Sequence, residues 1–137
     1  MNKTILLIED NEQNSYLLTF LLEQHGYEVV AASDGFSGME MARTLEPVMV
    51  LLDIQLPRMD GYAVARALRQ MDALQSIPIV AVTSYAMVGD KEKCLAAGCN
   101  GYIEKPIDPE TFVREIQAIA AATQAHENST ATARGTR

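Results

Sequence analysis

Short apolar runs and longer amphipathic segments alternate along the chain. The apolar runs are aliphatic and often β-branched, as in strands covered on both faces, and they occupy residues 5–8, 27–32, 48–52, 79–82 and 101–103. Apolar residues at helical spacing follow each run, with glycine or proline ending most of these segments, at residues 12–25, 35–46, 62–71, 91–97 and from 108 onward. This alternation predicts an α/β fold with a doubly wound, five-stranded parallel sheet and five helices.

The periodicity is lost near the end of the chain. From about Thr123 the sequence is mainly Ala, Thr, Ser and Asn without helical or strand spacing, which is typical of a flexible, low-complexity segment. A length of 137 residues is that of one domain. We therefore expect a single domain over residues 1–122 and a low-complexity C-terminal tail over residues 123–137.

Polar side chains stand at the ends of four predicted strands. Glu9 and Asp10 follow the first strand, Asp53 ends the third, and Thr83 and Lys105 follow the fourth and fifth. The carboxyl ends of parallel strands meet at one edge of the sheet, where open α/β folds place their ligands. The common flavodoxin-like order, 2-1-3-4-5, sets the first and third strands side by side, so three carboxylates would crowd together.

Such a cluster indicates a cation. Carboxylates within a few ångströms repel one another, and burying them unpaired is costly. A hard divalent cation with oxygen ligands relieves the repulsion, and so few protein ligands favour Mg²⁺. Lys105 adds a positive charge and Thr83 a hydroxyl donor at the same edge. This set of groups is suited to holding a phosphoryl group against a carboxylate nucleophile.

Composition narrows the class of protein. The 18 acidic residues outnumber the 11 basic ones, giving a net charge of −7, which argues against a nucleic-acid binder. No apolar stretch approaches the roughly 20 residues of a membrane span, and no signal-peptide core precedes the first strand. Cys94 and Cys99 are the only cysteines, so no disulfide framework is implied. We expect a cytoplasmic protein that binds neither nucleic acid nor membrane.

Four tracts of the sequence together resemble a known family. LLIEDNE, LLDIQLPRMDGY, AVTSYA and YIEKPID occur in the order and at the spacing of the receiver domain of two-component response regulators. The resemblance covers residues 3 to about 120, and the combination of tracts is highly specific. Within the family, the DIQLP tract and the absence of an effector domain resemble the stand-alone cell-cycle regulators of alphaproteobacteria. The fold that the resemblance implies is the five-stranded sheet already inferred.

The resemblance also implies a phosphoacceptor and a metal site. Asp53 matches the residue that takes up the phosphoryl group. Asp10 and Asp53 match ligands of Mg²⁺, together with the backbone carbonyl of Gln55. Glu9 stands where an aspartate is commoner, and it is expected to act on the metal directly or through water.

Three further roles are implied near the ends of the fourth and fifth strands. Thr83 and Lys105 match the residues that bind the phosphoryl oxygens, and the Lys105–Pro106 peptide is expected to be cis. Tyr102 matches an aromatic residue that turns inward on phosphorylation, so Thr83 and Tyr102 form the expected switch. Tyr85 is expected to shield the phosphoryl group from water, opposite Gln55.

These roles predict a signalling protein. A histidine kinase or a histidine phosphotransfer protein would supply the phosphoryl group, and a downstream protein would bind the phosphorylated form. The chain would catalyse only its own phosphorylation and dephosphorylation. A degenerate receiver that acts as a phosphorylation-independent interaction module is an alternative. A flavodoxin-like cofactor binder is another, but EDNEQN supplies acids where a phosphate-binding loop would need Gly, Ser or Thr.

The first predicted helix has a second apolar feature. Its leucines form a core stripe, and Tyr16 and Phe20 lie one turn apart on the opposite face. Receivers of this family meet their kinases with this helix, so Gln13, Tyr16 and Phe20 are expected to form a docking patch. The same patch is a candidate homodimer surface.

Overall fold

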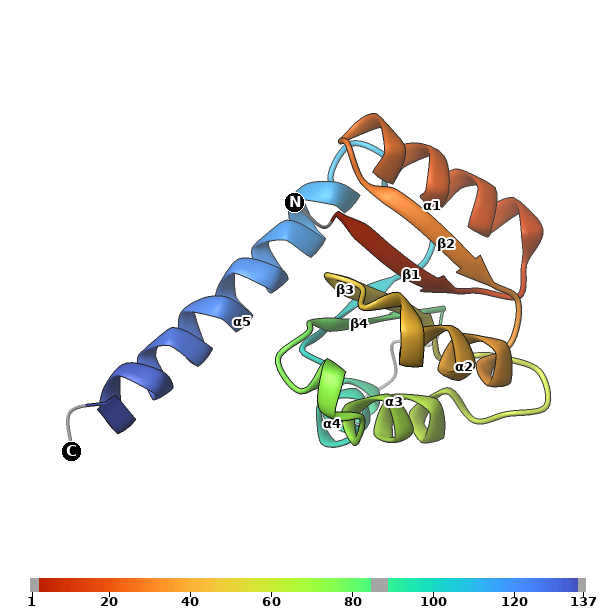
Figure 1. The fold of residues 1–137 in the computed structure, drawn as a ribbon. Helices are drawn as coiled ribbons and strands as arrows, with labels where there is room; N and C mark the ends of the chain where they lie inside the picture. The colour runs from red at the N-terminus through yellow and green to blue at the C-terminus, as the bar shows by residue number, and fades with distance from the viewer. Residues whose placement is uncertain (1–2, 85–88, 136–137) are drawn as a thin grey trace.

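A five-stranded parallel sheet lies at the centre of the computed structural model, which describes residues 3–84 and 89–135 (Figure 1). Its strands are β1 (Thr4–Ile8), β2 (Glu28–Ala32), β3 (Met49–Asp53), β4 (Ile79–Thr83) and β5 (Gly101–Glu104). Their order across the sheet is β2-β1-β3-β4-β5. The predicted fold class and strand order are confirmed.

Helices cover both faces of the sheet. They are α1 (Glu12–Gln24), α2 (Gly35–Leu45), α3 (Gly61–Arg69), α4 (Asp90–Ala96) and α5 (Phe112–Gly135), with a short 3₁₀ turn, η1 (Asp72–Leu74), after α3. Residues of α1 and α5 pack in one apolar cluster, and residues of α2, α3 and α4 pack in the other. The sheet is thus the middle layer of three, as a doubly wound fold requires.

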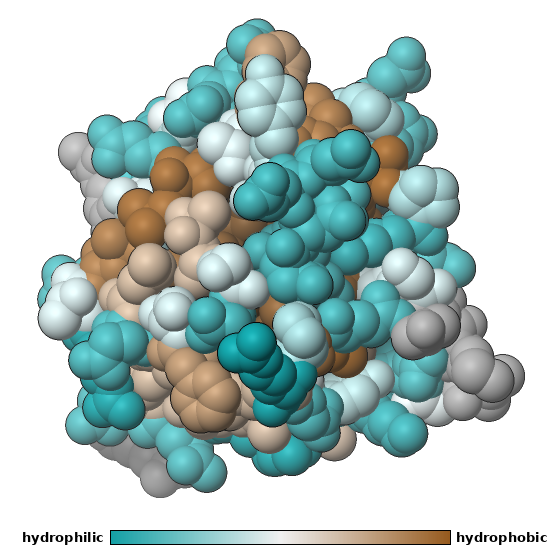
Figure 2. Space-filling model, turned by 90° about the vertical axis from the view of Figure 1, so that its right-hand side faces the viewer, coloured by the Kyte–Doolittle hydropathy of each residue, from teal (hydrophilic) through white to brown (hydrophobic). Residues whose placement is uncertain are grey.

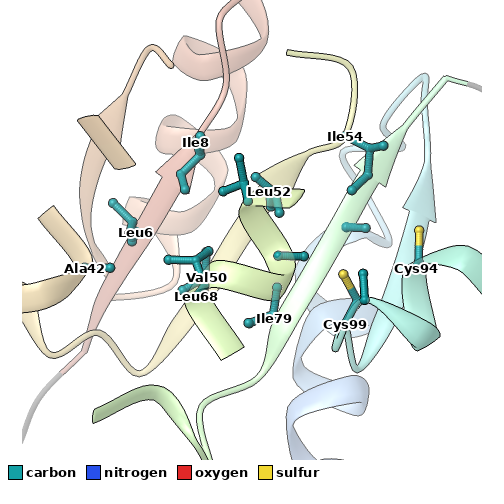
Figure 3. Close-up of a cluster of buried hydrophobic side chains, with 14 of the residues drawn as sticks. Leu6, Ile8, Ala42, Val50, Leu52, Ile54, Leu68, Ile79, Cys94 and Cys99 are labelled. Carbon is teal, nitrogen blue, oxygen red and sulfur yellow. The ribbon is translucent and has the colours of Figure 1, made fainter. Parts of the chain in front are cut away.

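The strands are apolar throughout because both of their faces are buried. In β1, Ile5 and Leu7 belong to the cluster under α1 and α5, whereas Leu6 and Ile8 belong to the cluster under α2 to α4. Figure 3 shows the second cluster, in which side chains of β1, β3 and β4 meet. Cys94 and Cys99 lie in this cluster as buried free thiols, so they serve as core residues.

The last helix differs from the sequence prediction at both ends. It begins at Phe112 and not at Asp108, because residues 109–111 form a turn in which the Asp108 carboxylate accepts the N–H of Glu110. It then continues to Gly135, through the segment expected to be flexible, and its end projects away from the sheet (Figure 1). Alanine has the highest helix propensity, which accounts for a helix over this last segment although its sequence has no apolar stripe. The domain boundary near residue 122 stays a prediction.

Candidate functional site

The acidic residues at the strand ends do come together. Strands β1 and β3 are neighbours, and Ile8 pairs with Leu52, so the residues that follow lie side by side. Glu9, Asp10 and Asp53 each offer a carboxylate oxygen, and these oxygens lie within 4.8 Å of one another. Glu9 and Asp53 are only 3% exposed, whereas Asp10 is on the surface. Figure 2 views the molecule from the side on which β1 and β2 end, where a hydrophilic region lies between apolar patches.

The loop after β3 holds the Asp53 carboxylate in place. The chain turns back after Asp53, so that the Gln55 N–H donates to Asp53 Oδ1 at 2.8 Å. The start of α3 packs directly on this loop, and Gly61 donates its N–H to the Ile54 carbonyl at 3.2 Å. A Cβ at Gly61 would lie 2.4 Å from the Ile54 Cα, so only glycine permits this approach. Asp60 caps α3 through the Tyr62 N–H, which gives this exposed acid a structural role.

Lys105 links the two buried carboxylates. Its Nζ lies 3.0 Å from Glu9 Oε1 and 3.2 Å from Asp53 Oδ2. Burial lowers the pKa of Lys105, but its hydrogen bonds and charge interactions with Glu9 and Asp53 outweigh this effect, so the pKa is raised overall. The ammonium is therefore fully charged at neutral pH. The Lys105–Pro106 peptide is cis, as the family resemblance implies.

The pKa of the Glu9 carboxyl group is strongly raised. Burial is the largest cause that raises its pKa from 4.5 to about 7, and a hydrogen bond and the charge of Asp53 add to it. Lys105 and the N–H of Asn11, which donates to Glu9 Oε2 at 3.2 Å, act in the opposite direction. Among the described residues, the buried Oε1 atom has no aligned hydrogen-bond donor, although Lys105 Nζ is within ion-pair distance.

The donor set fits a hard divalent cation. All three acidic side chains present oxygen, which is the ligand atom that Mg²⁺ and Ca²⁺ prefer. The poorly satisfied Glu9 Oε1 lies in the same cluster, and a cation there would offset the effects of burial and of the Asp53 charge that raise the Glu9 pKa. The residues present therefore suit a bound metal. The role expected of the Gln55 carbonyl stays a prediction.

The two residues predicted to form a switch lie beside this cluster. Thr83 ends β4, is 3% exposed, and accepts the Lys105 N–H through its backbone carbonyl at 2.8 Å. Because Asp53 pairs with Val82, Thr83 is at the same edge of the sheet as the Asp53 carboxylate. Tyr102 is half-buried in β5, packs against the core cluster and borders a surface groove between β5 and α5. Its inward movement stays a prediction, and Tyr85 lies outside the described residues.

The aromatic residues on α1 are exposed, as their spacing predicts. Tyr16 is 76% exposed and Phe20 is 50% exposed, and Gln13 is also on the surface. Tyr16 borders a surface hollow that Glu9 and Asp10 also line, between α1 and the end of β2. The patch is therefore continuous with the acidic cluster, although its docking role stays a prediction.

Two polar contacts in the site were not predicted from the sequence. Asn11 both caps α1 and orients Glu9, and an asparagine directly before a helical segment is a recognisable capping signal. The Gln55 side chain accepts the backbone N–H of Ser84 at 3.1 Å. No local sequence pattern reveals that contact, because it joins two loops that only the sheet brings together.

The fold and the acidic edge are those of a receiver domain. The family model described as the response regulator receiver domain matches residues 5–117, and the chain belongs to this family. It is similar to the polar-differentiation response regulator DivK of Brucella anthropi, with 40% identity over 118 residues, covering 86% of this chain and 96% of that protein. DivK of Brucella ovis is 39% identical over 118 residues, which again cover 86% of this chain and 96% of that protein. The predicted resemblance to alphaproteobacterial regulators is confirmed.

Solved structures agree with this assignment. The receiver domain of a sensor histidine kinase from Pseudomonas aeruginosa is 34% identical, with a TM-score of 0.80 and coverage of 88% of this chain and 99% of that one. That structure has a magnesium ion coordinated in its active-site cleft. The chemotaxis response regulator CheY4 of Vibrio cholerae is 25% identical, with a TM-score of 0.82, covering 87% and 99% of the two chains.

Membership of this family sets the general class of function. Receiver domains are signalling modules of two-component systems that bind Mg²⁺ at an acidic site and interact with kinases and downstream targets. Members of the family generally act in signalling and not as metabolic enzymes. Among the residues that the structure describes, no helix has both the length and the apolar character to span a membrane.

Proposed function

We propose that this chain is a cytoplasmic response regulator that accepts a phosphoryl group onto Asp53. One observation carries the proposal: Asp53 is buried at a strand end with one carboxylate oxygen 3.2 Å from the Lys105 ammonium, next to two further acids. A carboxylate nucleophile, a fixed cation and a cation-binding cluster are the parts that phosphoryl transfer to an aspartate needs. Membership of the receiver domain family supports this interpretation of the site.

The transfer uses groups that the fold has already positioned. A phosphohistidine of the donor protein places its phosphorus in line with a carboxylate oxygen of Asp53. The new O–P bond forms as the P–N bond breaks, and the imidazole nitrogen keeps the electron pair and takes up a proton from solvent. Lys105 lies beside the acceptor oxygen, so its ammonium stabilises charge on the phosphoryl oxygens. Attack by water on phosphorus later releases inorganic phosphate and restores the carboxylate.

Mg²⁺ is the cation that we assign to the acidic cluster. Asp10 and Asp53 would hold it with the backbone carbonyl of Gln55, and Glu9 would bind it directly or through water. When bound, Mg²⁺ neutralises the phosphoryl oxygens and lowers repulsion between the incoming group and the acids. Glu9 must be ionised for this role, which its pKa of about 7 permits at neutral pH.

Phosphorylation would be signalled through Thr83 and Tyr102. It replaces the single charge of the carboxylate by a phosphoryl group with up to two negative charges, and it places acceptor oxygens beside Thr83, whose hydroxyl can then donate to the phosphoryl group. Movement of Thr83 makes room for Tyr102, which already lies half-buried in the next strand. A downstream protein that prefers this arrangement would bind the phosphorylated form more tightly.

The donor is a histidine kinase or a histidine phosphotransfer protein that docks on α1. Gln13, Tyr16 and Phe20 are exposed, and Tyr16 borders the same hollow as Glu9 and Asp10. A helix seated on this patch would lie within reach of the acceptor edge. The relatives named DivK are response regulators, which supports a kinase as the partner. The patch is also the surface on which a homodimer would form.

Uptake of a phosphoryl group from a small donor tests the proposal. We expect acetyl phosphate with Mg²⁺ to add the mass of one phosphoryl group to the wild-type protein, and a chelator to prevent it. Asp53→Asn should take up none, and Asp60→Asn is the matched control because that acid only caps α3. A protein that is never labelled and still binds its partner would instead support the interaction module that does not depend on phosphorylation.

A further inference from the structure

The Gln55 side chain makes a contact that is separate from the metal role of its backbone. Its amide oxygen reaches from the loop after β3 and accepts the N–H of Ser84, the residue after β4, at 3.1 Å. Gln55 also donates its own N–H to Asp53 Oδ1 at 2.8 Å. One residue therefore connects the acceptor carboxylate to the backbone that directly follows Thr83.

The end of β4 is bonded to the chain on both of its sides, through main-chain and side-chain groups. On the β5 side, the Thr83 carbonyl accepts the N–H of Lys105 at 2.8 Å, a main-chain bond that does not depend on side-chain identity. On the β3 side, the Val82 carbonyl accepts the N–H of Ile54 at 3.2 Å, and the Gln55 side chain accepts the N–H of Ser84 at 3.1 Å. The Gln55–Ser84 bond uses a side-chain acceptor, so a substitution at Gln55 can remove it while the two main-chain bonds remain.

We infer that Gln55 is a positioning residue that holds the end of β4 in its resting arrangement and opposes movement of Thr83 toward the phosphoryl group. The inference rests on the proposed function, in which Thr83 moves when Asp53 is phosphorylated. If the Gln55–Ser84 bond exists only in the resting arrangement, it lowers the population of the active one. A ligand that binds the active arrangement is then bound more weakly, by the factor by which the bond lowers the population of that arrangement.

Replacing Gln55 by methionine tests this directly. Methionine matches the length of glutamine but has no carbonyl oxygen, so it cannot accept the Ser84 N–H. We expect the Ser84 amide of the free protein to exchange with solvent about threefold faster, the effect of losing one exposed hydrogen bond. Beryllofluoride, a phosphoryl analogue, should bind the variant in Mg²⁺ about threefold more tightly than it binds the wild type.

Gln55→Glu is the matched control for the exchange measurement. It keeps an acceptor oxygen at the same reach, so the Ser84 amide should remain as protected as in the wild type. Unchanged Ser84 exchange in Gln55→Met, or fast exchange in Gln55→Glu, would overturn the inference. So would faster exchange without tighter beryllofluoride binding, because the bond would then not oppose activation.

The outcome also separates this inference from the function on which it rests. A wild-type protein that neither takes up a phosphoryl group from acetyl phosphate nor binds beryllofluoride overturns the proposed function and the inference together. A wild-type protein that does both, beside a Gln55→Met variant identical to it, overturns the inference alone. Faster Ser84 exchange together with tighter binding in Gln55→Met supports both.

Discussion

The pKa of Glu9 makes the stability of the metal-free protein depend on pH near neutrality. In the fold this pKa is raised from 4.5 to about 7, mainly by burial and then by the neighbouring Asp53. A raised pKa means that the folded protein holds the proton more tightly than the unfolded chain does. Glu9 therefore contributes stability at acidic pH, and the contribution is lost as the pH rises through about 7.

The size of the effect follows from the two pKa values. At about pH 6 the tighter binding of the proton in the folded state contributes about 1 kcal/mol, and at about pH 8 it contributes almost nothing. The Glu9 side chain is only 1% exposed, so solvent screening reduces this contribution to the free energy of unfolding only slightly. We expect the free energy of unfolding to fall by about 1 kcal/mol over this range, which lowers the Tm by about 4 °C in a domain of this size.

Thermal unfolding in a chelator at the two pH values measures this effect. The Glu9→Gln variant is the control, because its side chain is neutral at both pH values. Its free energy of unfolding should fall by about 1 kcal/mol less than that of the wild type over this range. Adding Mg²⁺ should stabilise the wild type more at the higher pH, since the cation needs the ionised carboxylate. Equal pH dependence in the wild type and Glu9→Gln would refute the reasoning.

Three further variants test other parts of the account. Gly61→Ala should destabilise the fold by about 2 kcal/mol and slow labelling, because the new Cβ meets the Ile54 backbone at 2.4 Å; an unchanged denaturant midpoint would contradict the close packing. Lys105→Met should raise Mg²⁺ affinity by roughly tenfold, because the ammonium no longer competes for the carboxylates, while labelling slows; weaker Mg²⁺ binding in a titration would count against this. Replacing Tyr16 and Phe20 by Ala should slow transfer from the kinase by roughly tenfold without changing labelling by acetyl phosphate, and equal slowing of both would indicate a folding defect.

The exposed aromatic residue on α2 provides a control for the last of these variants. Phe36 is 63% exposed, comparable with Tyr16 and Phe20, but it lies on a different helix. Phe36→Ala should therefore leave transfer from the kinase unchanged. Slower transfer in this variant would mean that the docking surface extends beyond α1.

The sheet and the acidic cluster were predictable because their signals are local. A strand buried on both faces must be apolar at every position, so β3 is visible as a run that stops at Asp53. Once strands and helices alternate, parallel strands must end at one edge, and the polar residues at those ends must meet there. Glu9 and Asp10 could be placed beside Asp53 by this reasoning alone.

Other features depend on side-chain conformations that the sequence does not determine locally. That Lys105 contacts both Glu9 and Asp53 depends on where β5 places a long flexible side chain. The contact between Gln55 and Ser84 spans 29 positions along the chain and has no periodicity to reveal it. The extension of α5 was missed because the sequence after about Thr123 lacks the apolar spacing on which the prediction relied.

The central claim is that the phosphoryl group is carried by Asp53 and by no other acid. An acyl phosphate is reduced by borohydride to the alcohol, so the labelled aspartate becomes homoserine and can be located by peptide mapping. After labelling with acetyl phosphate and Mg²⁺, the account predicts homoserine at position 53 alone. Homoserine at Asp10 or Asp60, or a phosphoryl group stable to borohydride, would contradict it.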